Sequence, residues 1–120
     1  MTMIKTKSVY TKPSQDDGSR YLIELFWPEG LHTRYAKVDE WYNQLGPSYD
    51  LQRFEFNIGN WDDYKAKYRA ELIADKEKHA LLQQLAAQAR NGTITLLYGT
   101  TDDERNHANI VKELISKGLS

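Results

Sequence analysis

Residues 93–115 read TITLLYGTTDDERNHANIVKELI and predict a buried strand, a loop and a helix, in that order. The first six residues form a short apolar run with β-branched side chains between Gly92 and Gly99, which is typical of a strand covered on both faces. In the loop, Thr101 and Glu104 have the spacing of a capping box that begins a helix. The apolar side of the helix that follows is made up of His107, Ile110, Val111 and Leu114. We therefore expect this helix to pack back on the sheet.

The loop between this strand and this helix is where the sequence places a functional site. In open α/β sheets, ligands bind in the crevice beyond the carboxyl ends of the strands. Residues 99–107 occupy that position. The sequence predicts the place of a site and leaves open whether the protein is an enzyme.

The composition excludes several classes of site and partner. The 120 residues predict a single domain over residues 1–120, large enough to bury roughly two-thirds of its unfolded surface. The absence of cysteine excludes disulfides, thiolate nucleophiles and cysteine-bound metals. No apolar run approaches the ~20 residues that span a bilayer and no signal-peptide core is present, so we expect a cytoplasmic protein without membrane contact. The net charge of −1, with both signs interspersed, disfavours nucleic acid as a partner.

The order of elements along the chain predicts the fold class. Residues 3–10 predict an edge strand, residues 11–18 a loop, and residues 20–27 a central strand that is apolar on both faces. A helical region follows, and then the strand and helix described above. This order predicts a small α/β domain in which helices cover a short sheet.

The helical region divides into several segments. Residues 38–45 have apolar side chains at the spacing of one face of a short helix. Ser48 or Gly46 caps a second short helix that closes near residue 57. Asn60 begins a long helical region in which the register changes at Asp75, so that Asp75 caps a second long helix ending at residue 91.

Several short motifs occur in a fixed order along the chain: DGSRYLIE at 17–24, LFWPEG at 25–30, Trp41, LGPS at 45–48, Trp61 with Tyr64, YRAEL at 68–72, ITLLY at 94–98 and NHA at 106–108. With this combination the chain resembles the YeaO-like family of small bacterial proteins over nearly its whole length. The resemblance implies a three-layer, Rossmann-like α/β fold. It implies no established activity.

Two positions depart from the family pattern. The family usually has aspartate-arginine where this chain has Glu24-Leu25, and Trp-Pro-Arg-Gly where this chain has Trp27-Pro28-Glu29-Gly30. Two positive charges are therefore missing, at Leu25 and at Glu29. If the family uses those arginines to hold an anion, the resemblance implies that this member holds something less negative or no anion.

His107 and Glu24 are the candidate catalytic residues. His107 stands at the predicted start of a helix behind a strand end, where a histidine can act as a general acid or base near neutral pH. Its alternative role is a packing residue on the apolar face of that helix. Glu24 stands in an apolar run, where a carboxylate must be paired, solvent-facing or protonated. Its alternative role is a structural ion pair with Arg34, Arg53 or Arg69.

Four further residues are candidate ligand-binding residues, because they are polar or aromatic and lie near the same strand ends: Arg20, Trp27, Tyr98 and Asn106. Arg20 holds an anion or ties down the acidic loop before it, and Asn106 orients a ligand or fixes its own loop. Trp27 forms a pocket wall or a turn with the proline that follows. The chain has no histidine pair at metal-ligand spacing, so we predict no metal site and no cofactor.

Three functional hypotheses follow. The first is a protein that binds or converts a small polar metabolite in a pocket at the carboxyl ends of the strands, with acid–base chemistry by His107 and Glu24 if it is an enzyme. The second is a non-catalytic interaction module whose aromatic helix faces, around Trp61 and Tyr68, bind a second copy of the chain or a partner protein. The third is a transcription-related role, which the charge distribution disfavours.

Overall fold

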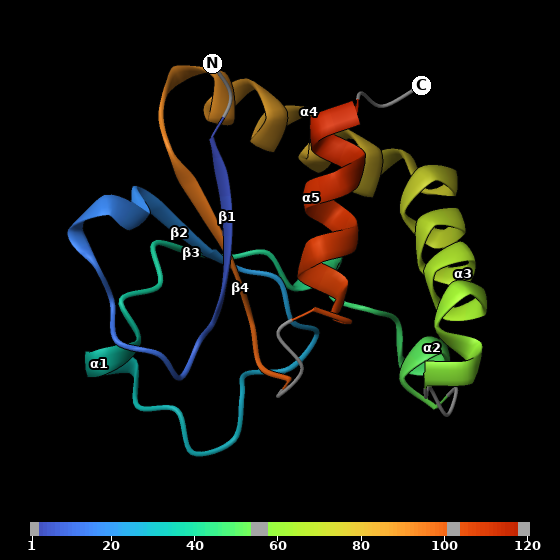
Figure 1. Ribbon diagram of the computed structural model, residues 1–120, viewed down its shortest axis with the longest axis horizontal. Helices are drawn as coiled ribbons and strands as arrows, with labels where there is room; N and C mark the ends of the chain where they lie inside the picture. Colours follow the sequence, from blue (N-terminus) through green and yellow to red (C-terminus); the bar gives the residue numbers. More distant parts are fainter. Residues whose placement is uncertain (1–2, 54–57, 101–103, 118–120) are drawn as a thin grey trace.

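The protein folds around a four-stranded parallel sheet (Figure 1). The computed structural model describes residues 3–53, 58–100 and 104–117. The strands pair in the order β1-β4-β2-β3, and their bounds are β1 Ile4–Ser8, β2 Ser19–Leu22, β3 Glu40–Trp41 and β4 Ile94–Tyr98. Each of these pairs is parallel, so the carboxyl ends of the strands meet at one edge of the sheet.

Helices and loops cover the two faces of the sheet unequally. The helices are α1 Thr33–Ala36, α2 Tyr49–Gln52, α3 Trp61–Ala74, α4 Lys76–Asn91 and α5 His107–Lys117, and 3₁₀ turns span Gln15–Asp17, Asn43–Leu45 and Ile58–Asn60. The long helices α3, α4 and α5 form the larger hydrophobic core with one face of the sheet (Figure 1). The other face carries connecting loops and α1 over a smaller core. The predicted small α/β fold is confirmed.

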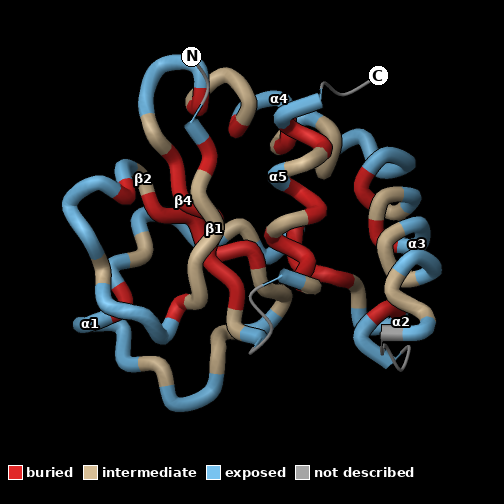
Figure 2. The backbone as a smooth tube through the Cα atoms, viewed as in Figure 1, coloured by how far each residue is buried: buried red, intermediate tan, exposed pale blue. Residues whose placement is uncertain are grey.

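β4 is one of the two interior strands of the sheet, and it is buried at every position (Figure 2). It pairs with β1 on one side and with β2 on the other. Ile94, Leu96 and Tyr98 join the core beneath the helices, while Leu97 joins the core beneath the loops. This burial on both faces explains the nearly continuous apolar run, and the strand predicted at residues 93–98 is confirmed.

α5 packs its apolar side on the sheet, as its periodicity predicts. The buried residues of the helix are His107, Ala108, Ile110, Val111, Leu114 and Ile115. Asn106 precedes the helix, and its side-chain oxygen accepts a hydrogen bond from the backbone N–H of Asn109 at 2.9 Å. This bond satisfies one of the N–H groups that the first turn leaves without a helical partner. The predicted capping box depends on Thr101, which lies outside the described residues.

The predicted break between the two long helices is confirmed. α3 ends at Ala74, and α4 begins at Lys76. Asp75 stands between them in an extended conformation, and its carboxylate accepts a hydrogen bond from the backbone N–H of Lys78 at 3.0 Å. The hydroxyl of Ser48 caps α2 in the same way, as predicted, but this helix ends at Gln52 instead of near residue 57. None of the helices within the described ranges has the length and hydropathy that a membrane-spanning segment requires.

The short helix predicted at residues 38–45 is wrong. These residues form β3 and a 3₁₀ turn instead. The backbone N–H of Asp39 donates to Arg20 O, and that of Tyr42 donates to Leu22 O, each at 2.8 Å. These bonds pair the segment with the open edge of β2, and that pairing overrides a helical spacing of apolar side chains. The strand predicted at residues 20–27 is in the right place but ends at Leu22.

Candidate functional site

Glu24 links three segments at the carboxyl edge of the sheet. Its Oε2 accepts a hydrogen bond from the backbone N–H of Gly99, which directly follows β4, at 2.6 Å. The same oxygen lies 3.4 Å from Nε2 of His107, the first residue of α5. A Cβ at Gly99 would lie 3.3 Å from this oxygen and 3.5 Å from Cγ of Pro28, so the absence of a side chain lets the carboxylate approach. The ion pair considered with Arg34, Arg53 or Arg69 is wrong, because within the described ranges none of these arginines pairs with Glu24, whose carboxylate contacts Gly99 and His107 instead.

His107 is buried, and its ring is fixed on both sides. Its Nε2 lies 2.7 Å from the carbonyl oxygen of Ile23, which can only accept a hydrogen bond, so Nε2 carries the hydrogen. The ring also meets that of Tyr68 edge to face, with centroids 6.0 Å apart. Burial lowers the pKa of His107 and outweighs the nearby Glu24 carboxylate and the bond to Ile23. The imidazole is therefore neutral at neutral pH.

The contacts of this pair limit what it can do chemically. The hydrogen on Nε2 of His107 is directed to a backbone carbonyl, so this nitrogen has no lone pair with which to act as a base. The Glu24 carboxylate already accepts from a backbone N–H. The sequence placed Glu24 and His107 at the same site, and the two side chains are in contact. Their contacts connect the segment after β2 with β4 and α5. The proposed catalytic role stays a prediction.

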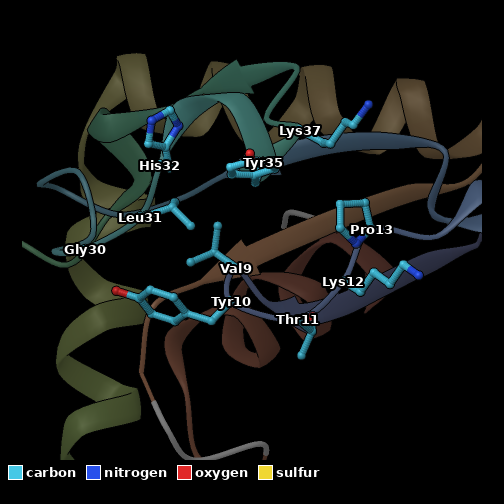
Figure 3. A pocket seen from close by; sticks show the side chains of 10 residues that line it. All are labelled: Val9, Tyr10, Thr11, Lys12, Pro13, Gly30, Leu31, His32, Tyr35 and Lys37. Atoms are coloured by element: carbon cyan, nitrogen blue, oxygen red, sulfur yellow. The ribbon is translucent and has the colours of Figure 1, made fainter.

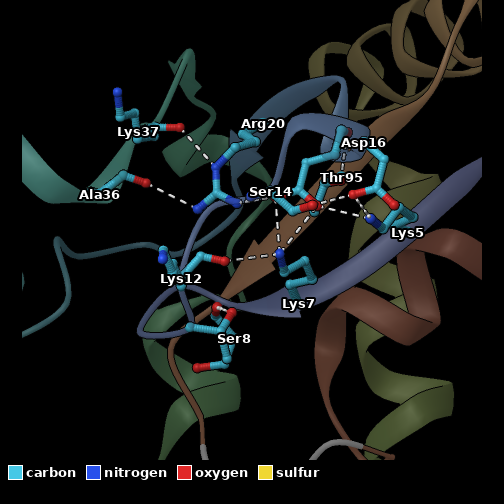
Figure 4. Close-up of polar contacts among 12 residues, drawn as sticks. Lys5, Lys7, Ser8, Lys12, Ser14, Asp16, Arg20, Ala36, Lys37 and Thr95 are labelled. Atoms are coloured by element: carbon cyan, nitrogen blue, oxygen red, sulfur yellow. Dashed lines mark hydrogen bonds and ion pairs between the residues drawn. The ribbon is translucent and has the colours of Figure 1, made fainter.

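Arg20 belongs to a different cluster, on the loop-covered face of the sheet (Figure 4). Its guanidinium donates to the Asp17 carboxylate at 2.5 Å and to the carbonyl oxygens of Ala36 and Lys37 at 3.0 and 2.9 Å. These three contacts use all three nitrogens of the side chain. The alternative that Arg20 ties down the preceding acidic loop describes these contacts, and its role in holding a ligand stays a prediction.

Asp17 is the centre of that cluster. Its side chain has no exposed surface, and Lys5 and Lys7 approach it at 2.8 and 3.0 Å in addition to Arg20. Burial by itself would raise the pKa of Asp17, but hydrogen bonds from Lys5, the Ser14 backbone, Lys7 and Arg20 hold it well below its usual range. The carboxylate is therefore ionised throughout the physiological pH range.

The remaining predicted ligand-binding residues also have structural partners. The indole N–H of Trp27 donates to Leu31 O at 3.0 Å, and its ring meets that of Trp41 with centroids 5.4 Å apart. Tyr98 is buried in the larger core, and Asn106 caps α5. The six predicted residues thus divide between the two faces and the edge of the sheet, and among them only Glu24 and His107 have a mutual contact described above.

A cleft that sequence reasoning missed lies beside the carboxyl end of β1 (Figure 3). We call it the Tyr10–Tyr35 cleft; its volume is about 610 Å³, and it is lined by Val9, Tyr10, Thr11, Lys12, Pro13, Gly30, Leu31, His32, Tyr35 and Lys37. Two loops form its walls, one after β1 and one between β2 and β3. The aromatic and lysine side chains of these loops are the sequence features that could have indicated the cleft. Neither loop has a periodic pattern, so the sequence did not predict that the two loops lie together.

The family described as the inactive DUF488-N3 subclade matches residues 3–120. The chain belongs to this subclade. It is 30% identical over 111 residues to the uncharacterized protein YeaO of Escherichia coli (strain K12). The aligned residues cover 92% of this chain and 94% of YeaO. It is 25% identical over 116 residues to the uncharacterized protein Rv3073c of Mycobacterium tuberculosis (strain ATCC 25618 / H37Rv). This alignment covers 96% of this chain and 95% of Rv3073c. No solved structure matches the chain.

The resemblance to YeaO-like proteins is thus confirmed. In this member of the DUF488-N3 subclade, the two positions that lack the expected arginines follow β2. Leu25 is half-buried, and a Cβ at Gly46 would lie only 2.1 Å from its backbone nitrogen. Glu29 is exposed, and its carbonyl oxygen accepts a hydrogen bond from the hydroxyl of Tyr10 at 2.7 Å. Glu29 therefore connects the segment after β2 to one wall of the Tyr10–Tyr35 cleft.

Proposed function

We propose that this protein binds a small polar molecule in the Tyr10–Tyr35 cleft and does not convert it chemically. The observation that carries the proposal is the cleft itself. Its volume of about 610 Å³ falls in the range of roughly 300–1,000 Å³ that is typical of small-molecule sites. It also lies where parallel sheets usually bind ligands, beyond the carboxyl end of a strand.

The lining of the cleft supports binding of a molecule with both apolar and polar parts. Val9 is buried, and Leu31 is half-buried as part of the smaller core, so the floor is apolar and fixed. Besides the two tyrosine hydroxyls, the polar side-chain groups of the lining are the hydroxyl of Thr11, the imidazole of His32 and two lysine ammonium groups. A few polar groups around an apolar floor are the usual composition of such sites.

The contacts of Glu24 and His107 favour binding over catalysis. The Nε2 hydrogen of His107 is directed to a carbonyl, and Oε2 of Glu24 accepts from a backbone N–H, so proton transfer at these two atoms would break bonds that connect three elements. The chain belongs to the inactive DUF488-N3 subclade, which agrees with a role without turnover.

The interaction module remains the second hypothesis, and it has lost part of its support. Tyr68 has no exposed surface, so it does not serve as an exposed anchor for a partner. Trp61 and Tyr64 are only partly buried, and their rings stack on each other with centroids 5.6 Å apart. Binding of a second copy or of another protein stays a prediction.

The test is an NMR titration of the ¹⁵N-labelled protein against a library of small polar metabolites. We expect amide shifts at residues 9–13 and 30–37, and we expect Tyr35→Ala to weaken them. Tyr49→Ala is the matched control, because both tyrosines are exposed on one-turn helices and each packs on a neighbouring side chain. Shifts confined to the surroundings of Glu24 and His107, or no binding by any compound, would contradict the proposal.

A further inference from the structure

We propose that the ligand of the Tyr10–Tyr35 cleft is a planar ring compound with an anionic group, because exposed aromatic rings on two loops line the same hollow as Lys12 and Lys37, which lie together at one end of it. This inference rests on the proposed function and specifies its ligand class. The evidence comes from the rings, from the two lysines and from the backbone that holds one of them.

The aromatic side chains of the cleft are exposed although they are large. Tyr10 is 52% exposed and Tyr35 is 68% exposed. Figure 3 shows the Tyr10 ring on one loop, the rings of Tyr35 and His32 on the other, and Val9 and Leu31 between them. The hydroxyl bond of Tyr10 to Glu29 O holds its ring in place, and the His32 and Tyr35 rings contact each other at 5.5 Å between centroids. Rings fixed in this way offer flat surfaces on which a planar ligand can stack.

Lys12 and Lys37 supply positive charge at one end of the cleft. Both side chains are exposed, and Figure 3 shows them at the same end, with Pro13 near them and Gly30 at the opposite end. Within the part of the chain that the structure describes, neither ammonium is in an ion pair, whereas the ammonium groups of Lys5 and Lys7 are paired with Asp17. A ligand anion would therefore find two uncompensated charges here.

Two carboxylates in the surroundings of the lysines, those of Asp17 and Asp39, are already engaged. Asp17 is surrounded by Lys5, Lys7 and Arg20. Asp39, two residues after Lys37, accepts a hydrogen bond from the backbone N–H of Arg20 at 2.7 Å. These contacts hold both carboxylates on other partners, so they compete little with a ligand for the two free ammonium groups.

Lys37 is held in a conformation that a lysine rarely adopts. Its φ of 54° and ψ of 48° are left-handed, and among the described residues it is the one non-glycine with positive φ. The buried Arg20 side chain fixes this geometry, because it donates to the carbonyl oxygens of Ala36 and Lys37. Glycine would occupy the position with less strain, so the lysine here agrees with a role for its side chain in the cleft.

The first experiment compares ligands that share a ring system and differ in whether they have an anionic group, by NMR titration at low salt. The ring-matched pairs are indole-3-acetate with indole-3-acetamide, and adenosine monophosphate with adenosine. We expect at least one anion to shift the amides of residues 9–13 and 30–37 and to bind about tenfold more tightly than its neutral partner. We also expect added salt to weaken that binding. The pair that responds distinguishes a carboxylate from a phosphate.

The second experiment uses Lys37→Gly, which removes one ammonium and relieves the left-handed strain, so the variant keeps its fold. We expect it to weaken binding of the anion roughly threefold, in the range of a single exposed ion pair, and to leave the neutral compound unchanged. Lys112→Ala is the control, because Lys112 is exposed on α5, outside the cleft lining.

Each failure points to a different conclusion. Equal binding of the charged and neutral members, or binding unaffected by Lys37→Gly, would overturn the anionic ligand and leave the proposed binding function standing. If neither pair binds while another compound of the metabolite library occupies the cleft, the ring class is wrong and the function stands. If no compound of any kind binds there, both proposals fail.

Discussion

Asp17 connects three separate segments of the chain through one buried carboxylate. Lys5 and Lys7 come from β1, Arg20 comes from β2, and Arg20 in turn holds the carbonyls at the end of α1. The Asp17 carbonyl also accepts from the hydroxyl of Thr95 in β4 at 2.6 Å. A buried charge is strongly destabilising unless oppositely charged and hydrogen-bonding groups surround it. The stability of the fold therefore depends on these partners of Asp17.

We predict that Asp17→Asn lowers the free energy of unfolding by about 3 kcal/mol, because it leaves the buried Arg20 guanidinium without a counter-charge. Urea denaturation of the variant and the wild type measures the loss. Asp16→Asn is the control, because the Asp16 side chain is 80% exposed and its removal should have a much smaller effect. Equal stabilities for Asp17→Asn and wild type would show that the cluster contributes little.

At the scale of secondary structure, one residue separates the two longest helices. α3 and α4 are consecutive in sequence, and only Asp75 interrupts them. Its extended backbone and its hydrogen bond to the Lys78 N–H begin α4 as a new helix. This change of direction lets both helices pack on the same core.

We predict that Asp75→Ala destabilises the protein by about 1 kcal/mol, the typical loss when a helix loses its capping side chain. Asp75→Asn should retain most of the stability, since its side-chain oxygen still accepts the hydrogen bond. Thermal unfolding of the two variants beside the wild type makes the comparison. If both variants lose the same stability, the negative charge matters rather than the cap.

At the scale of the whole molecule, the two faces of the sheet each contain one buried ionisable group with a lowered pKa. His107 lies in the core beneath the helices, where burial lowers its pKa from 6.5 despite Glu24 beside it. Asp17 lies beneath the loops, where its cationic partners lower its pKa from 3.8. In both cases the unfolded chain binds the proton more readily than the folded protein does.

The stability of the fold should therefore fall on acidification in two stages. The His107 contribution is complete above pH 6.5 and is lost as the pH falls below that value, and the Asp17 contribution is lost below pH 3.8. Each group adds at most about 1.4 kcal/mol per pH unit to the slope. Urea unfolding between pH 8 and pH 3 measures it, and His107→Gln should remove the first stage. A stability that stays constant from pH 7 to pH 5 would contradict this assignment.

Local pattern was enough to determine several elements from the sequence alone. The strand at 93–98, the apolar face of α5, and the caps at Ser48 and Asp75 depend on side chains within a few residues of one another. Such short-range effects act in any tertiary setting, so the sequence predicts them well. The α/β class followed from the order of these elements.

Tertiary structure alone decided the rest, because the deciding contacts join residues far apart in the chain. Residues 38–45 have a helical spacing, yet the unpaired edge of β2 draws them into β3. Glu24 meets Gly99 across 75 positions, and His107 meets Ile23 across 84. The Tyr10–Tyr35 cleft exists only because two loops without periodicity end side by side on one face of the sheet (Figure 3). No local propensity encodes such a juxtaposition; the pairing of strands in the folded sheet creates it.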